Sequence, residues 1–323
     1  MNTSQSNTAS PYNGESISTL SMKRRSGWRA YLRNYDLYLM LVPVLAYYVI
    51  FQLQPIYGLQ IAFKDFSASL GIWDSPWVGF AHFERFFSSY YFGRLLSNTI
   101  EISLYALVVG FPMPILLALL LNEVRWLKLK KFIQNVTYFP HFVSVIVVAG
   151  MINVFTSPDG LINTVASWFG AEKSSLLTNP AYFKTIYVIS HVWQHTGWNA
   201  IIYIAALASI NPELYEAATI DGASRLKRIL HVSLPGIFST IIVLFILQIG
   251  SLLDVGFQKI LLLQNPLNLE ASDVISTYVY RTGILQGNYS LSTAVGLFNT
   301  LINVTLLVTA NTVIKRFTKN SLW

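Results

Sequence analysis

Cysteine is absent from the 323-residue chain. Its absence excludes disulfide bonds, thiolate metal sites and cysteine nucleophiles, and leaves the redox compartment open. Charged residues are also scarce, at 11% of the chain against about 25% in an ordinary soluble domain. A chain so poor in charge lacks the polar surface that a globular fold exposes to water. Hydrophobic residues at 53% and a mean hydropathy of +0.48 indicate a bilayer-embedded protein instead.

Asp, Glu, Lys and Arg are missing from six long stretches, each longer than the roughly 20 residues that a helix needs to cross a bilayer. Backbone that faces lipid must satisfy its own hydrogen bonds, so these stretches are predicted to be helices. The sequence therefore predicts an all-α integral membrane protein with about six transmembrane helices, at residues 37–63, 102–122, 132–158, 185–212, 232–253 and 282–314.

Lys and Arg are unevenly divided between the two sets of loops. Fifteen of the 22 belong to the N-terminal tail, the loops at 123–131 and 213–231, and the C-terminus. Because cytoplasmic loops carry the excess of basic residues, both termini are predicted to lie inside. Residues 1–30 are predicted to be a disordered cytoplasmic tail and 31–323 one transmembrane domain. The net charge of +7 does not indicate nucleic acid, since the basic residues cluster beside apolar stretches.

The loop between predicted helices four and five contains signals for two short helices. Asn211 suits the N-cap of the first, and Pro212 suits its first position, where no N–H partner is needed. Asp221-Gly222 would end it, and Ser224 would cap the second. These signals predict a cytoplasmic helix–turn–helix whose apolar side chains could dock onto a soluble partner. The alternative is an amphipathic interfacial helix that only connects two spans.

The same loop carries a motif with a recognisable spacing. Glu216-Ala-Ala, three further residues, Gly222 and a later Leu-Pro pair resemble the EAA loop of type I ABC importer permeases. The stretches 55–66, 138–141 and 272–281 look like permeases of polysaccharide and oligosaccharide importers, including maltose-type and alginate-type systems. The resemblance covers about residues 30–323.

The resemblance implies a permease subunit that forms half of the translocation pathway of an ATP-driven carbohydrate importer. The expected location is the bacterial cytoplasmic membrane, which the chain crosses several times. Expected partners are a homologous second permease, an ATP-binding subunit dimer and an extracytoplasmic sugar-binding protein. The chain is not expected to be an enzyme or to bind a cofactor, because it has no GxxxxGK[ST] run and ATP and Mg would bind the partner ATPase. The residues implied to couple to the ATPase are Glu216, Ala217, Ala218, Asp221, Gly222, Leu234 and Pro235.

A polar stripe interrupts predicted helix four. Side chains at i, i+3, i+4 and i+7 from His191 share one helix face, and such a face should turn toward protein or a cavity rather than lipid. Hydrogen-bonded packing between helices is the alternative for each residue. The spacing of His191 and His195 also suits a metal, but no third ligand lies near, so no metal site is predicted. The predicted substrate path comprises His191, Gln194, His195, Trp198, Asn199 and Gln248, with Asp254, Asn299 and Asn303 as further candidates.

Two other functions compete with the importer. An ion-gradient-driven secondary transporter would place ionisable groups near the membrane midplane, and the predicted helices offer only the two histidines there. A glycan-synthesis subunit would need a catalytic constellation such as paired carboxylates, and none is recognisable. The sugar stays open, because histidines suit a uronate as partial cations and a neutral sugar as hydrogen-bond donors.

Overall fold

The computed structural model describes residues 35–318, and their regular structure is helical apart from one isolated β-bridge between Lys64 and Trp77. The predicted all-α class is confirmed. The chain divides after Tyr57 into two units. The predicted tail at 1–30 lies outside the described residues.

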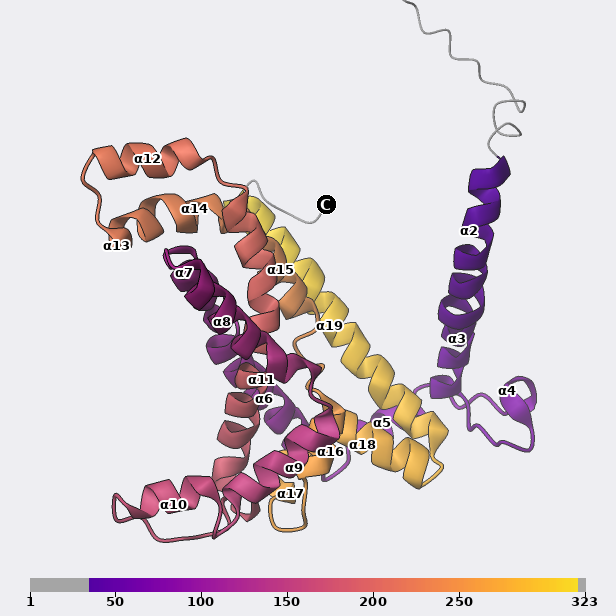
Figure 1. Ribbon diagram of the computed structural model, residues 1–323. Helices are drawn as coiled ribbons and strands as arrows, with labels where there is room; N and C mark the ends of the chain where they lie inside the picture. The colour runs from indigo at the N-terminus through magenta and orange to yellow at the C-terminus, as the bar shows by residue number, and fades with distance from the viewer. Residues whose placement is uncertain (1–34, 319–323) are drawn as a thin grey trace, which may run out of the picture. The chain divides into compact units, whose positions relative to one another are not determined.

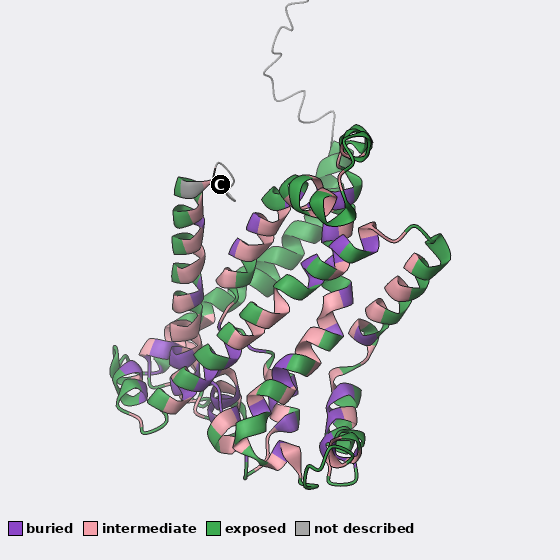
Figure 2. Cartoon of the chain, turned by 90° about the vertical axis from the view of Figure 1, so that its left-hand side faces the viewer, coloured by how far each residue is buried: buried purple, intermediate pink, exposed green. Residues whose placement is uncertain are grey.

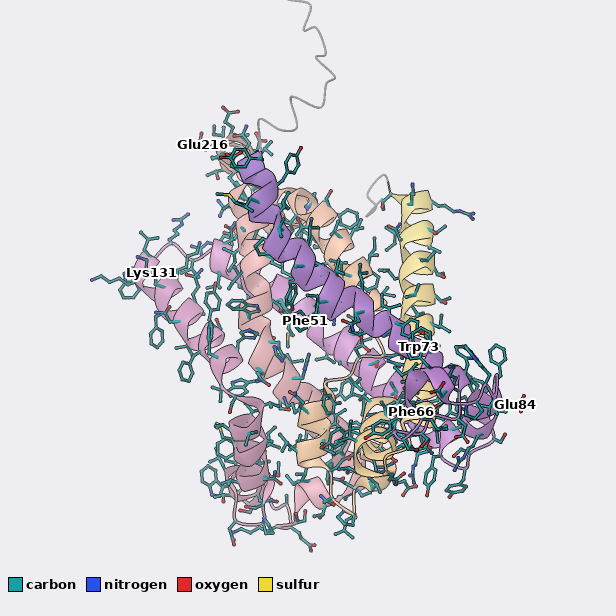
Figure 3. All side chains as sticks on the ribbon, turned by 90° about the vertical axis from the view of Figure 1, so that its right-hand side faces the viewer. Phe51, Phe66, Trp73, Glu84, Lys131 and Glu216 are labelled. Atoms are coloured by element: carbon teal, nitrogen blue, oxygen red, sulfur yellow. The ribbon has the colours of Figure 1, made fainter. Side chains whose placement is uncertain are left out.

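The first unit contains α2 (Tyr35–Tyr47), the π-helix η1 (Tyr48–Leu53) and α3 (Gln54–Tyr57). The 3₁₀-helix η2 (Gly58–Phe63) follows at the start of the second unit. Phe51, labelled in Figure 3, belongs to η1. These four elements cover the predicted first span, 37–63.

Four helical stretches among residues 35–318 are long and apolar enough to cross a membrane: Tyr35–Phe63, Phe92–Asn122, Val145–Ser167 and Tyr289–Arg316. A fifth is added if Arg225–Gly236 and Phe238–Gly250 count as one bent span. The helix α11 (Pro180–Ala208) has the length, at 29 residues, but carries the polar stripe. The count of six spans and the orientation therefore stay predictions.

The predicted third span, 132–158, is wrong as one continuous helix. The structure has α8 (Leu127–Tyr138), a 3₁₀ turn η3 (Phe139–Phe142) and then α9 (Val145–Thr156). Pro140 lies in the break and has no N–H to continue the helix. The chain restarts at Ser144, whose hydroxyl accepts a hydrogen bond from Val147 N at 3.4 Å. The stretch 132–158 contains no charged residue, yet the chain changes direction within it.

The predicted fifth span, 232–253, is also interrupted. It begins with the π-helix η5 (Ile229–Ser233) and the short α14 (Leu234–Gly236), and then bends by 62° into α15 (Phe238–Gly250). Proline at position 235 explains the break, because its ring cannot continue the backbone hydrogen bonding.

The second unit collects its connections at two opposite ends (Figure 1). The helices α12 (Pro212–Ile220), α13 (Arg225–Arg228) and α14 lie at one end, with the α7–α8 connection and the last turns of α19 (Tyr289–Phe317). The helices α10 (Leu161–Ser167), α17 (Leu269–Ser272) and α18 (Ile275–Tyr280) lie at the other. The loops predicted to face the cytoplasm thus share one end, called the inner end below.

The core follows α11, which packs against α6 (Phe92–Gly110), α7 (Pro112–Asn122) and α8. Its buried side chains fall into two clusters, around Phe183 and around Tyr203. Figure 2 shows buried residues concentrated where helices meet and exposed ones on their outward faces. Many of the exposed side chains are large and apolar, as expected for helices surrounded by lipid.

The helices α8 and α11 touch through their backbones. A Cβ atom at Gly197 of α11 would collide with the carbonyl oxygen of Thr137 in α8. Glycine is therefore required here for close approach, as at the contacts of many membrane helices.

A buried carboxylate organises the end opposite the inner end. Asp273 has no exposed surface and forms ion pairs with Arg94 of α6 at 3.2 Å and with Arg281 at 2.9 Å. Thr277 Oγ1 donates to the same carboxylate at 3.2 Å, and Asn98 Nδ2 donates to the Asp273 carbonyl at 3.0 Å. These contacts fasten the α17–α18 segment to α6.

Candidate functional site

The inner end presents α12 as predicted. Asn211 Oδ1 accepts a hydrogen bond from Glu213 N at 3.1 Å, and Pro212 is the first helical residue. Gly222 ends the turn after α12 with a φ of +73°, which a residue with a side chain adopts only at a cost. The Ser224 hydroxyl caps α13 by accepting from Lys227 N at 3.4 Å. The predicted caps and turn are confirmed.

Three polar contacts hold α12 to the rest of the inner end. The Tyr215 hydroxyl lies 3.0 Å from Ser233 Oγ, and Asn122 Nδ2 donates to it at 3.5 Å. Thr219 Oγ1 accepts from Arg228 Nη1 at 3.2 Å. Tyr215 therefore faces its own chain and does not belong to the exposed side of α12.

Arg228 also reaches the end of the second span. Its Nη2 donates to Glu123 Oε2 at 2.9 Å, and the two side chains are only 14% and 13% exposed. Because the pair is largely shielded from water, it is stronger than a surface salt bridge. It connects the helix α12, through α13, to the residue that follows α7.

The rest of α12 is mostly exposed among the described residues. Glu216 and Ala217 are exposed, and Ile220 is 86% exposed. Figure 3 shows Glu216 at the extremity of the inner end. Asp221 and Gly222 are exposed beside them, Ala218 is half-buried, and Pro235 is exposed. Leu234 packs against the core cluster around Tyr203.

A polar cavity of about 230 Å³ lies between α6, α7, α11 and α15. The structure brings four of the six residues predicted for the substrate path to its wall, three from α11 and one from α15. Its polar lining is His191, His195, Thr196, Asn199, Gln248 and Ser251.

The other two predicted residues, Gln194 and Trp198, do not line this cavity. Gln194 is buried, where its Oε1 accepts from Lys259 Nζ at 3.4 Å and its Nε2 donates to the Val143 carbonyl at 3.4 Å. Trp198 stacks on His141 with ring centroids 4.4 Å apart and planes 2° apart. Gln194 thus makes the hydrogen-bonded packing contact that the sequence left open as the alternative, whereas Trp198 stacks on His141 and stays 42% exposed.

His141 was missed as a site residue. It lies in η3, and its Nδ1 is 3.4 Å from Nδ1 of His195. The sequence places these histidines 54 positions apart, so only the break after α8 brings them together. Among the described residues no group of three His, Cys, Asp or Glu is arranged to hold a metal ion.

Lys259 was also missed. It lies in the short helix α16 (Phe257–Leu263), is 5% exposed, and has its Nζ 5.7 Å from the ring centroid of Tyr187. Within residues 35–318 it forms no ion pair. Burial lowers its pKa to about 8, so the ammonium stays mostly charged at neutral pH. In the sequence, Lys259 could have been noticed as a single lysine in an otherwise uncharged stretch.

The chain after α15 is tied to α19 by the two asparagines that the sequence offered as candidates. Asn303 Oδ1 accepts from Leu253 N at 3.1 Å, and Asn299 Nδ2 donates to Asp254 Oδ1 at 3.1 Å. Asp254 lines a second cavity of about 100 Å³, which shares His191 and Gln248 with the first. The asparagines therefore hold this loop in place, and neither belongs to the lining of either cavity.

Comparison with known proteins places the chain in a family. Residues 110–319 match the family model described as binding-protein-dependent transport system inner membrane component. The chain is an inner-membrane permease of this family. Membership favours a binding-protein-dependent importer over the ion-gradient-driven alternative, and it agrees with a transport subunit rather than an enzyme.

Individual relatives cover nearly the whole permease. It is 44% identical to protein LplB of Bacillus subtilis over 96% of this chain and 95% of the relative. It is also 44% identical to the polygalacturonan/rhamnogalacturonan transport system permease protein YteP of Bacillus subtilis, over 89% of this chain and 90% of the relative.

The fold of the permease is also found among solved structures. A bacterial ABC transporter involved in the import of the acidic polysaccharide alginate contains a chain with a TM-score of 0.83 and 42% identity. The match covers 90% of the permease and 99% of that chain. The same kind of transporter is solved in complex with an alginate pentasaccharide-bound periplasmic protein, with a TM-score of 0.84, 41% identity and coverage of 91% and 99%.

Proposed function

We propose that this permease forms half of the pathway by which an acidic oligosaccharide is imported at the expense of ATP. A homologous second permease would supply the other half, an extracytoplasmic binding protein would deliver the sugar, and a separate ATPase dimer would bind α12. ATP binding and hydrolysis would move α12 and so alternate the side on which the pathway is open.

The observation that carries the proposal is the polar cavity beside α11. Its hydroxyl, amide and imidazole groups suit the many hydroxyls of a sugar, and a polar wall inside an apolar bundle is costly without such a role. The α15 wall ends early, at Gly250, and irregular backbone follows it. Interrupted helices of this kind often surround substrate sites in transporters.

The acidic character of the sugar is supported by two relatives and one side chain. YteP is named for polygalacturonan and the structural relative for alginate, and both polymers consist of uronic acids. Lys259, which has no carboxylate partner within residues 35–318, adds a buried cation beside the helix that carries His191 and His195. A nearby positive charge lowers the cost of bringing a carboxylate out of water.

The proposed coupling role of α12 is supported by the division of its surface. One side is hydrogen-bonded to its own chain through Tyr215 and Thr219, and the other leaves Glu216 and Ile220 exposed. A helix that is fastened on one side and open on the other can transmit the movement of a partner to the bundle.

Uptake into proteoliposomes containing the complete importer tests this function. Uronate oligosaccharides should be transported in preference to neutral ones of equal length. Gln248→Leu should reduce uptake of the carried sugar roughly tenfold, the effect of losing a hydrogen bond worth about 1.4 kcal/mol. The matched variant Gln286→Leu, at an exposed position outside the cavity, should transport normally.

The variant Lys259→Gln tests the acidic substrate separately from the transport pathway. Loss of uronate preference with neutral uptake retained would support the acidic substrate. Preference for a neutral sugar in the unaltered importer would disprove the acidic substrate while leaving the pathway intact. Normal uptake by Gln248→Leu would count against the pathway itself.

A further inference from the structure

The first turns of α8 and the residues just before them form the densest basic cluster among the described residues. Arg125, Lys128, Lys130 and Lys131 fall within seven positions, and no acidic residue follows until Asp159. In residues 35–318 none of the four forms an ion pair. The neighbouring Glu123 is already paired with Arg228. The cluster therefore has an uncompensated charge of four.

The helix itself gains nothing from these cations. The N-terminal turn of a helix carries partial positive charge, so lysines there are unfavourable, and α8 has no acidic residue in its first turn to offset them. Arg125, Lys128 and Lys131 are exposed, and Figure 3 shows Lys131 pointing away from the bundle. A binding partner of opposite charge would remove this local cost.

An apolar surface continues from the two exposed lysines of α8. Phe132, Val136 and Phe139 follow at the helical spacing that places them on the same face, and they are 65%, 55% and 70% exposed. The opposite face, with Ile133 and Thr137, packs toward α11 and is half-buried. The lysines thus lie at the inner-end edge of an exposed apolar stripe.

We propose that the segment 125–131 binds the headgroups of anionic phospholipids in the inner leaflet. The lysine stems would lie along the apolar stripe while their ammonium groups contact phosphate, and Trp126, which is 67% exposed, would sit among the headgroups. A soluble acidic partner would use the charge but not the apolar stripe. The site requires only that the α7–α8 loop face the cytoplasm, whichever sugar the permease carries.

A fluorescent reporter beside the cluster measures the binding directly. Because the chain has no cysteine, Phe132→Cys provides a single thiol for labelling in the complete importer, assembled with cysteine-free partner subunits. Quenching by brominated phosphatidylglycerol is compared with quenching by brominated phosphatidylcholine in bilayers. Leu301→Cys serves as the control reporter, because it is exposed on α19 and has no charged residue within four positions.

The reporter at position 132 should show a clear preference for phosphatidylglycerol, and the reporter at 301 none. Each of Lys128→Gln and Lys131→Gln should weaken the preference about fivefold, and added salt should weaken it further. Replacing Lys315 and Arg316 together by Gln removes the same charge at the inner end as the double variant Lys128→Gln/Lys131→Gln, and it should leave the preference unchanged. Measuring the two lysine variants singly allows a result even if the double variant fails to assemble.

Three results would overturn the proposal. Equal quenching by both lipids at position 132 would show that the cluster does not select anionic headgroups. A preference that survives both lysine substitutions would place its source elsewhere. Absence of quenching by either lipid would show that a protein subunit covers this face of α8.

Discussion

Charged residues at the two ends of the bundle have opposite surroundings. Asp273 is wholly buried, and two arginines and a threonine of the same chain satisfy its carboxylate. At the inner end, Glu216 is exposed and has no such network. A buried charge has to be paired within its own chain, because leaving it unpaired would destabilise the fold. An exposed charge beside exposed apolar residues can instead contact a second protein. The first cluster should therefore determine stability and the second transport.

The largest expected effect is that of Asp273→Asn, which keeps the shape of the side chain and removes its charge. The substitution leaves the half-buried Arg94 and Arg281 without a counter-ion, a loss of about 3 kcal/mol. The amount of permease in the membrane and its melting temperature in detergent should both fall. Asp159→Asn is the matched control, since that carboxylate is 95% exposed and should change neither.

Gly222→Pro should give the next largest effect, and on transport alone. Proline holds φ near −65°, so it cannot adopt the +73° of this turn, and α12 would lose its orientation. Uptake should fall to roughly a tenth or less, the scale of a ~1.4 kcal/mol defect in coupling. Immunoblotting should find the variant in the membrane at the normal level. Near-normal uptake would contradict a coupling role for the loop.

Glu216→Ala should reduce transport less and should not affect stability, because the exposed carboxylate makes no contact that stabilises the fold. A severalfold loss of sugar-stimulated ATP hydrolysis is expected, about 1 kcal/mol of contact with the partner. Co-purification of the ATPase measures whether the contact is weakened. An unchanged complex with unchanged hydrolysis would place the docking surface elsewhere on the inner end.

The smallest effect is expected from Glu123→Gln, which weakens the contact between Arg228 and the end of α7. The cost should be about 0.5 kcal/mol, because the pair loses its charge but the amide of the glutamine still accepts one hydrogen bond from Arg228. A double-mutant cycle with Arg228→Met should show that the two changes are not additive. Additive effects on melting temperature and uptake would mean that Glu123 and Arg228 do not interact.

Local pattern was sufficient for the features that depend on neighbouring residues. The absence of charge marked the helices, and Asn211, Pro212 and Gly222 marked the limits of α12, because caps and turns act over a few positions. The breaks after α8 and before α15 were missed because apolar composition alone does not distinguish a bent span from a straight one.

Features that depend on distant residues could not be predicted. Arg94 and Asp273 are 179 positions apart, and His141 meets His195 only because the third span bends. Lys259 carries one charge in a short loop, where the sequence does not show whether it is buried. The sequence placed the polar residues of α11 on one face of a helix. Which of them reach the cavity depends on the helices that pack on either side of that face.

The backbone contact at Gly197 constrains how the helices of the permease can move. Because no side chain separates the two backbones at this point, the contact has no compressible layer, and α8 and α11 are expected to move together. The stacked rings of His141 and Trp198 add a second contact, between η3 and α11. Opening and closing of the cavity would then involve movement of α8 and α11 against its other walls, among them α15 with Gln248.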